Sequence, residues 1–394
     1  MKPNGFKLEM EILSLLHIGD GSTLIPLEYV VSDGLVKVAN LDFLIEALSD
    51  RIASQLGEEM MSLSDFLRDK NQAHLLQRPE LYSREMRLVG GAGPQLMKDL
   101  NSRDKKQINK AQIKTFVKTL GKPFIPGSSI KGAVRTALAY NILKKAGGGK
   151  AEKILNASVK AGRDREGRIK SFPSERDAVE KYLLRDGDGI DKDVMALMGF
   201  TDSEPLDHRN LVVVKGKRIN GPPTSYYECL PHGLKTTFVV FFNEFGNEKE
   251  GTLRRPNANL IPTTPQELFG ILNGFARDLI AFERRQNANM RERDFSGKHN
   301  QDLERIINFY NALEAKMDQH PDAGFMVLGW GTGWHGKTVG LLLKDYPGFK
   351  DAMYAYRMGG RRKEPSAFPV SREVILGSNI EPVFGWVMLR LKED

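Results

Sequence analysis

Apolar and charged residues alternate near the N-terminus of the chain. The apolar positions of this alternation are Phe6, Leu8, Met10 and Ile12, with lysine or glutamate between them. A period of two is typical of a half-buried strand. Two further apolar runs, LEYVV and LVKV, enclose Ser32-Asp33-Gly34, which predicts a β-hairpin.

Strand-like and helix-like patterns then follow one another without regular alternation. Apolar spacing predicts helices from Asn40 to about Leu56, over 130–146, from about Pro265 to Arg285, and to about Met317. Strand patterns recur at 211–215, 225–230, 236–244, 324–330, 338–343 and 383–391. This mixture favours an α+β fold with antiparallel sheets over a doubly wound parallel sheet. Two ferredoxin-like (RRM-like) halves are the simplest interpretation.

The boundaries between the halves follow composition. We expect a first domain over 1–205 and a second over 206–394, with the mixed charged and glycine-rich residues 150–205 joining them. Residues 84–118 are polar and basic, and we interpret them as an inserted hairpin or mobile arm. The second domain contains a glycine-rich loop at 329–337.

The net charge and the cysteine content exclude only a few classes of function. The chain has 58 Lys and Arg residues against 50 acidic ones, a formal charge of +8 that suits a polyanionic partner. Cys229 is the one cysteine, so the sequence offers no intrachain disulfide and no cysteine-based zinc site. No apolar run is long enough to cross a bilayer, and we expect a cytoplasmic protein without membrane partners.

The stretch PFIPGSSIKGAVRTAL, residues 123–138, predicts a turn followed by a helix that Ser128 or Ser129 caps. Lys131 falls in the first turn, where a cation opposes the helix dipole, and Arg135 follows one turn later. Free N–H groups at the helix start together with these two cations favour an anion site. The alternative is an ordinary capped helix whose Lys131 points into water.

Residues 331–338 match the phosphate-loop pattern G-x-x-x-x-G-K-T. The residues that follow have a strand pattern, and no earlier apolar strand ends in an aspartate that could hold Mg²⁺. A loop with Gly331, Gly333, Trp334 and Lys337 therefore favours binding to a single-stranded nucleic acid over nucleotide hydrolysis. A tight hairpin with core tryptophans is the structural alternative.

HIGDG, residues 17–21, supplies His17, Gly19 and Gly21 after a strand. His17 is either a packing residue or the general base of a metal-independent endoribonuclease. No motif of paired carboxylates or metal ligands supports other chemistry, so we expect no catalytic residue, metal or cofactor. Basic segments at 98–118, 284–298 and 354–363 fit a groove that follows phosphates.

LSLLHIGDG, PFIPGSSIKGAVRTAL and LGWGTGWHGKTV occur in this order, and together they resemble the RAMP superfamily of CRISPR-associated proteins. Within it, the chain is similar to the subunit type that stands at the 3′ end of the crRNA in type III-A Csm effector complexes. The G-K-T ending departs from the plainer glycine loop of the family and leaves the role of Lys337 open.

The resemblance implies two RRM-like RAMP domains and a non-catalytic subunit that holds the 3′ portion of the crRNA and is needed for its 3′-end maturation. Implied partners are the crRNA, the adjacent RAMP backbone subunit, the small subunit and host ribonucleases. The residues implied to lie at the RNA are His17, Gly19, Gly21, Ser128, Ser129, Lys131, Arg135, Gly331, Gly333, Trp334 and Lys337. Three alternatives stay open: a phosphate-loop NTPase, an endoribonuclease using His17, and a structural assembly subunit whose basic surface meets acidic proteins.

Overall fold

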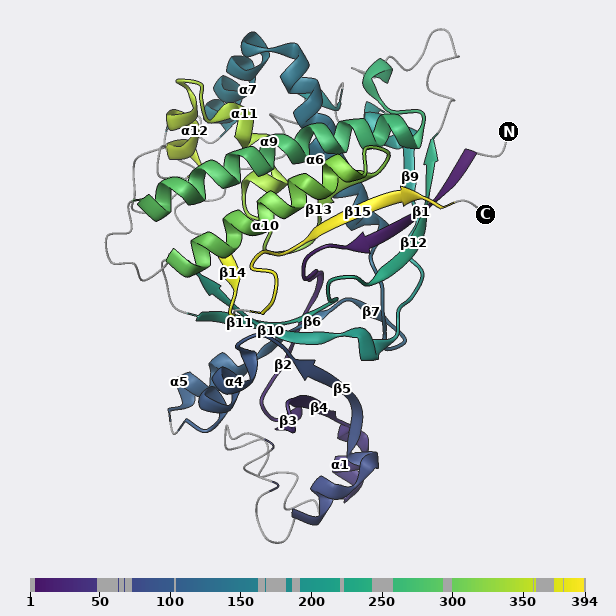
Figure 1. The fold of residues 1–394 in the computed structure, drawn as a ribbon, viewed down its shortest axis with the longest axis vertical. Coiled ribbons are helices and arrows are strands. Elements are labelled where there is room, and N and C mark those ends of the chain that lie inside the picture. The colour runs from purple at the N-terminus through teal and green to yellow at the C-terminus, as the bar shows by residue number, and fades with distance from the viewer. Residues whose placement is uncertain are drawn as a thin grey trace.

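The computed structural model describes residues 4–47, 63, 67, 73–102, 104–161, 167, 182–185, 192–219, 223–242, 258–292, 300–356, 358, 372–377 and 379–392. These residues form two large sheets, here called sheet 1 and sheet 2, with helices packed on and beside them (Figure 1). The predicted α+β class with mostly antiparallel sheets is confirmed. None of the described helices combines the length and the apolar character that crossing a membrane requires.

Sheet 1 is antiparallel and has the N-terminal strand at its centre. Its order is β13 (Gly324–Val327), β15 (Trp386–Leu391), β1 (Asn4–Ile12), β12 (Lys235–Phe242) and β9 (Met198–Phe200). Leu8, Met10 and Ile12 are fully buried, whereas the charged residues between them are partly exposed. The predicted alternating strand is therefore confirmed.

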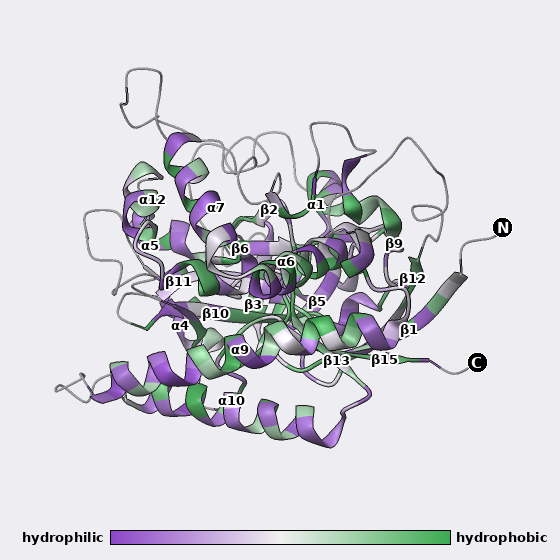
Figure 2. Ribbon diagram, turned by 90° about the horizontal axis from the view of Figure 1, so that it is seen from above, coloured by the Kyte–Doolittle hydropathy of each residue, from purple (hydrophilic) through white to green (hydrophobic). Residues whose placement is uncertain are grey.

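Helices α9 (Pro265–Glu292), α10 (Asn300–Gln319) and α6 (Gly127–Ala146) cover sheet 1. The ring of Phe269 on α9 packs on β13 because Gly324 has no side chain, and a Cβ there would lie 2.4 Å from the ring. In Figure 2, α10 lies at the edge of the molecule with a largely hydrophilic ribbon, while β13 and β15 are largely hydrophobic. The main hydrophobic cluster thus includes the space between sheet 1 and its helices, and it continues onto sheet 2 through residues such as Met86, Ile113 and Phe116.

Sheet 2 is mixed. Its order is β2 (Gly19–Leu24), β6 (Ile113–Phe116), β11 (Pro223–Cys229), β10 (Val212–Arg218), β5 (Tyr82–Leu88), β4 (Leu35–Ala39) and β3 (Tyr29–Ser32), with β14 (Glu373–Ile375) also paired to β10. The pairs β5–β10 and β6–β11 are parallel. Asp33 and Gly34, with φ of 53° and 75°, form the turn of the β3–β4 hairpin, as predicted.

Shorter elements complete the described fold. They are α1 (Leu41–Ala47), α4 (Ala92–Leu100), α5 (Lys105–Ile108), the ribbon of β7 (Lys118–Thr119) and β8 (Lys122–Pro123), α7 (Gly148–Ala161), α11 (Gly340–Leu343) and α12 (Phe349–Ala355). Asn40 begins α1 by accepting hydrogen bonds from the Phe43 and Leu44 N–H groups. The predicted continuation of this helix to Leu56 lies outside the described residues.

Two expectations about local structure were wrong. Residues 84–118 are no inserted arm, because they supply β5, α4 and β6, and Leu96, Ile113 and Phe116 are fully buried. Their few apolar residues are the buried ones, and the many charges on the solvent side conceal that pattern. Residues 338–343 contain the short helix α11 in place of a strand. A short apolar run does not by itself fix a helical or strand period.

Both sheets draw strands from both sides of residue 205, so the division expected there does not coincide with the boundary between the sheets. Parts of the basic segments at 284–298 and 354–363, including Arg361, Arg362 and Lys363, and most of the linker after Ala161 lie outside the described residues.

Candidate nucleic-acid interface

Three segments that are far apart in the sequence line one groove of about 340 Å³. The HIG turn contributes Ile18 and Gly19, and the first turns of α6 contribute one face. The glycine-rich loop with the end of β13 forms the opposite wall. The lining residues are Ile18, Gly19, Ser129, Gly132, Ala133, Thr136, Val327, Leu328, Gly329, Trp330, Thr332, Gly336 and Lys337. The three motifs of the sequence therefore meet in space.

The glycine-rich loop is fastened directly to the HIG turn. The backbone N–H of Trp330 donates to the His17 carbonyl over 2.8 Å. Gly329 has a φ of 76°, and a Cβ at this position would lie 2.4 Å from the same carbonyl oxygen. Only glycine allows this backbone conformation and this approach without strain. Gly331 and Gly333 also have positive φ, of 84° and 78°, so the loop follows a path that side chains would disfavour.

His17 lies beneath this junction, and its side chain does not face the groove. The residue is 2% exposed, and its ring Nδ1 donates to the Glu228 carbonyl over 2.7 Å. Burial lowers the pKa of His17, which the Glu228 carbonyl opposes, so the imidazole is neutral near pH 7. Gly19, beside the ring, and Gly21 are both exposed. The histidine packs and orients the turn that carries them.

The carboxylate of Glu228 connects the strands around this turn. It is fully buried and accepts hydrogen bonds from the Arg84 guanidinium and the Phe116 N–H, each over 2.8 Å. It also pairs with Lys118. A buried carboxylate is stable when it is paired and hydrogen-bonded in this way. Glu228 thereby fixes β5, β6 and β7 against β11, the strand whose carbonyl holds His17.

Helix α6 begins differently from the sequence prediction. Pro126 is the N-cap residue and makes no side-chain cap, so neither Ser128 nor Ser129 caps the helix. The Gly127 N–H donates instead to the Asp202 carboxylate over 2.7 Å. A Cβ on Gly127 would lie 2.4 Å from the Phe200 carbonyl oxygen, so the helix start sits directly against the end of β9. Ser128 is exposed and Ser129 lines the groove.

Lys131 and Arg135, both partly exposed, contact groups of their own chain. The Lys131 ammonium donates to the Met198 carbonyl over 3.0 Å. Arg135 donates to both carboxylate oxygens of Asp193, over 3.1 Å and 2.9 Å. Burial raises the pKa of Asp193, but the Met195 N–H and Arg135 hold it below its usual value. Both cations thus have partners within the protein that the sequence pattern did not reveal.

Aromatic rings and cations lie along the opposite wall. Trp330 stacks on the buried Tyr227 ring with centroids 4.3 Å apart. The Lys114 ammonium lies 5.5 Å from the Trp330 ring centroid, and its side chain is exposed. Lys337 is exposed and lines the groove, and none of the ion pairs among the described residues involves it. Lys114 lies in the basic segment 98–118, for which the sequence predicted contact with phosphates, but it was not among the individual candidate residues.

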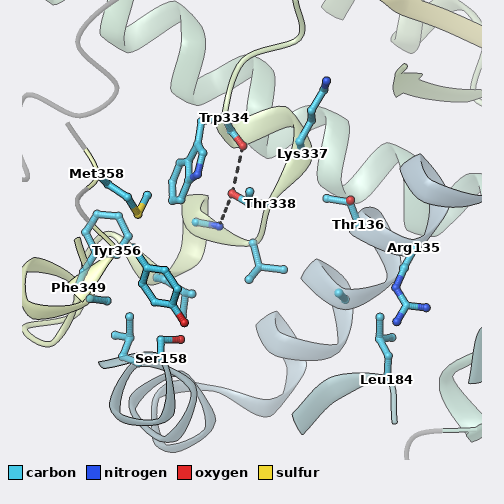
Figure 3. A pocket seen from close by; sticks show the side chains of 16 residues that line it. Arg135, Thr136, Ser158, Leu184, Trp334, Lys337, Thr338, Phe349, Tyr356 and Met358 are labelled. Carbon is cyan, nitrogen blue, oxygen red and sulfur yellow. Dashed lines mark hydrogen bonds between the residues drawn. The ribbon is translucent and has the colours of Figure 1, made fainter. Parts of the chain in front are cut away.

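Trp334 lines a second cavity on the other side of Thr136 and Lys337. The loop differs from a phosphate loop in the state of its threonine hydroxyl and in the length of the helix that follows it. The Thr338 hydroxyl donates to the Trp334 carbonyl over 3.1 Å and accepts from the Gly340 N–H over 3.1 Å, so it is engaged by backbone groups (Figure 3). The helix that follows has only four residues. Within the described ranges, no cluster of three or more His, Cys, Asp or Glu side chains could hold a metal ion.

Comparison with known proteins gives one consistent result. Residues 9–335 match the model of the RAMP superfamily. Over 98% of this chain and 89% of the relative, the sequence is 23% identical to the "CRISPR system Cms protein Csm5" of Methanocaldococcus jannaschii. A protein of the same name from Streptococcus thermophilus is 24% identical over 53% of this chain and 54% of its own.

Solved structures show the same fold. A chain of the cryo-EM structure of a Csm–crRNA–target RNA ternary complex in a type III-A CRISPR-Cas system has a TM-score of 0.67 at 21% identity. That match covers 98% of this chain and all of the other. The crystal structure of T. onnurineus Csm5 has a TM-score of 0.65 at 20% identity, with 96% and 99% covered.

Proposed function

The chain belongs to the RAMP superfamily, and from this premise we propose that it is a non-catalytic, RNA-binding subunit of a type III-A Csm ribonucleoprotein. In this role it holds the 3′ portion of the crRNA at the end of the filament of RAMP backbone subunits and is needed for 3′-end maturation. The names of the similar proteins, and the complex in which one similar chain was solved, support this assignment. Other Csm subunits and a trimming ribonuclease are the protein partners.

The groove between the three motifs is the observation that carries the proposal. Gly19 and Gly132 line the groove and are exposed, so a ribose-phosphate chain can approach the protein backbone there, and Ser129 offers a hydroxyl. Gly331 and Gly333 are not among the residues that line the groove. Gly21 and Ser128 are also exposed and lie close in the chain to Gly19 and Ser129, which line the groove. Recognition of the backbone suits a guide RNA, because the guide sequence varies and readout of its bases would restrict it.

The cations that attract phosphates in this proposal differ from those at the helix start. Lys337 on the groove and Lys114 above Trp330 are exposed. Lys131 and Arg135 position the start of α6 through Met198 and Asp193. Partial desolvation of its ammonium lowers the pKa of Lys337, and a phosphate that pairs with this group would stabilise its charged form.

The two enzymatic alternatives fit the geometry less well. His17 is buried with its Nδ1 engaged, so a scissile phosphate has no access to it without movement of Gly19. The Thr338 hydroxyl, which would hold Mg²⁺ in a nucleotide hydrolase, is engaged by its own loop. We therefore propose binding without catalysis.

Position 132 offers a direct test, because Gly132 lines the groove and a Cβ there meets nothing within 4 Å. Gly132→Glu adds a negative charge where the phosphates would pass, and Gly132→Gln adds the same volume without charge. For the full chain and a single-stranded RNA of guide length, we expect Gly132→Glu to bind roughly fivefold to tenfold more weakly than Gly132→Gln at low salt. The difference should shrink as salt increases, whatever the RNA sequence.

Equal RNA affinities for the Glu and Gln variants at low salt would contradict the proposal. If the Glu variant bound RNA normally but failed to assemble with its protein partners, the groove would instead be a contact for an acidic protein. Gly132→Lys provides the complementary control, since it should bind at least as tightly as Gly132→Gln.

A further inference from the structure

We propose that the second cavity, beside the groove, binds one unpaired nucleobase of the same RNA, flipped out of the chain that the groove holds. This inference rests on the proposed function. The cavity lies between α6, α7, α11, α12 and the glycine-rich loop, and its volume is about 340 Å³. That is near the lower end of the roughly 300–1,000 Å³ usual for ligand pockets and suits a single ring system.

The cavity walls are mainly aromatic and aliphatic. Figure 3 shows Trp334, Phe349, Tyr356 and Met358 on one side, with Arg135, Thr136 and Leu184 across the cavity. Leu155, Val339 and Leu343 line the cavity as well. A base has two apolar faces and gains about 1–3 kcal/mol from stacking on an aromatic side chain. The chemistry of the wall therefore matches a base better than it matches a phosphate or a sugar.

Trp334 is held in place before any ligand arrives. Its ring occupies the space over Gly340, where a Cβ would lie 1.9 Å from the ring. It also packs against Phe349 and His335, with ring centroids 5.9 Å and 5.0 Å away. A rigid aromatic wall loses little conformational entropy on binding, which favours stacking.

The cavity and the groove share part of their walls. Thr136 and Lys337 line both, and in Figure 3 these two residues lie on the same side of the cavity. Lys337 takes part in none of the ion pairs between described residues. A phosphate bound at Lys337 in the groove would thus place its nucleoside next to the cavity mouth. This continuity is the reason for choosing a base of the bound RNA as the occupant.

Two hydroxyl groups in the cavity wall are already engaged by the backbone. The Ser158 hydroxyl donates to the Ile154 carbonyl over 2.8 Å, and the Thr338 hydroxyl is engaged on both sides. Such a wall offers stacking and few hydrogen bonds to base edges. We therefore expect the cavity to accept any of the four bases, in keeping with a guide of variable sequence.

The test places 2-aminopurine at one position after another of a single-stranded RNA and records its fluorescence with the full-length protein. One position should be quenched by Trp334 beyond its neighbours. Ala352 lines the cavity from α12 and is 7% exposed, so Ala352→Phe fills the cavity while Ala352→Ser leaves it open. We expect Ala352→Phe to abolish the extra quenching and to weaken binding roughly 5-fold to 100-fold. Ala352→Ser should behave as the wild type.

Ala139→Leu fills the same cavity from α6 and serves as a second variant should Ala352→Phe not fold. If the filled variants bind RNA and quench like the wild type while Gly132→Glu still weakens binding, the base cavity is overturned and the proposed function stands. If neither change affects RNA binding, the proposed function fails as well. Loss of assembly with a protein partner, with RNA binding and quenching intact, would identify a protein side chain as the occupant and would also overturn the inference.

Discussion

His335 is a histidine whose burial has a measurable consequence. The residue is 1% exposed, and neither ring nitrogen has a hydrogen-bond partner among the residues that the structure describes. Its ring packs edge-on against Phe282 with centroids 4.4 Å apart. Burial, and then the charges of Arg372 and Lys344, lower the pKa of His335 to about 4, with Asp345 acting in the opposite direction. The glycine-rich loop therefore buries a neutral imidazole of its own in the protein core.

This pKa predicts that acid destabilises the protein partly through His335. Between pH 6.5 and 4 the unfolded chain binds the proton and the folded chain does not, so the free energy of unfolding falls as the pH falls. The full effect is about 3 kcal/mol. His335→Leu should flatten the pH dependence of urea unfolding in this window. The same pH dependence in both proteins would show that His335 does not carry it. His17, whose pKa burial also lowers, stays in both proteins, so some slope should remain.

Arg135 shows what residue-level reasoning from sequence can and cannot supply. Its helix and its place one turn after Lys131 follow from local spacing, and both were predicted. Its partner Asp193 lies 58 residues further along the chain, in a segment that the sequence marked only as a linker. Among many acidic residues, nothing local distinguishes the one that folding brings to the helix. The charge of a residue can be read from sequence, but whether that charge is free for a ligand depends on tertiary contacts.

At the scale of the element, the two glycines in the first turns of α6 should respond in opposite directions to the same substitution. Gly127→Ala places a methyl group against the backbone oxygens of Phe200 and Thr201, at 2.4 Å and 2.7 Å, and should destabilise the fold by about 2–3 kcal/mol. Gly132→Ala meets open space and should stabilise it by about 0.5–1 kcal/mol, because alanine favours a helix. Urea unfolding of both variants measures this contrast. Equal effects would refute the close approach of α6 to β9.

Elements could be predicted where the signal is local. Asp33-Gly34 specifies the β3–β4 hairpin through two residues with positive φ, and the alternation in β1 reports a strand with one buried face. Residues 84–118 and 338–343 failed for a common reason. Their apolar residues are too few to fix a period, and the neighbouring strands and helices decide the conformation. Residue spacing showed the groove only as three separate motifs, and only the resemblance to a family implied that they lie at one RNA.

On the scale of the whole molecule, strand pairing between distant segments dominates the fold. β1 pairs with β12 on one side and with β15 on the other. β5 and β6 pair with β10 and β11. Sheet 1 is therefore completed only when the last third of the chain is present, although β1 forms its centre. Sheet 2 likewise needs β10, β11 and β14 from beyond residue 205. Sequence patterns identify individual strands, but they do not tell which strands from distant parts of the chain pair with each other.

This pairing predicts that the chain does not divide into two independently folding halves at residue 205. A fragment of residues 1–205 leaves β1 without both of its partner strands and leaves β5 and β6 without β10 and β11. A central strand without neighbours exposes unpaired backbone groups and its apolar face, so the fragment should lack a cooperative unfolding transition and should aggregate. Mixing it with 206–394 during refolding should restore the transition, because both sheets can then form. The full chain, refolded in parallel, is the control, and a fragment 1–205 that unfolds cooperatively by itself would disprove the interdependence of the two sheets.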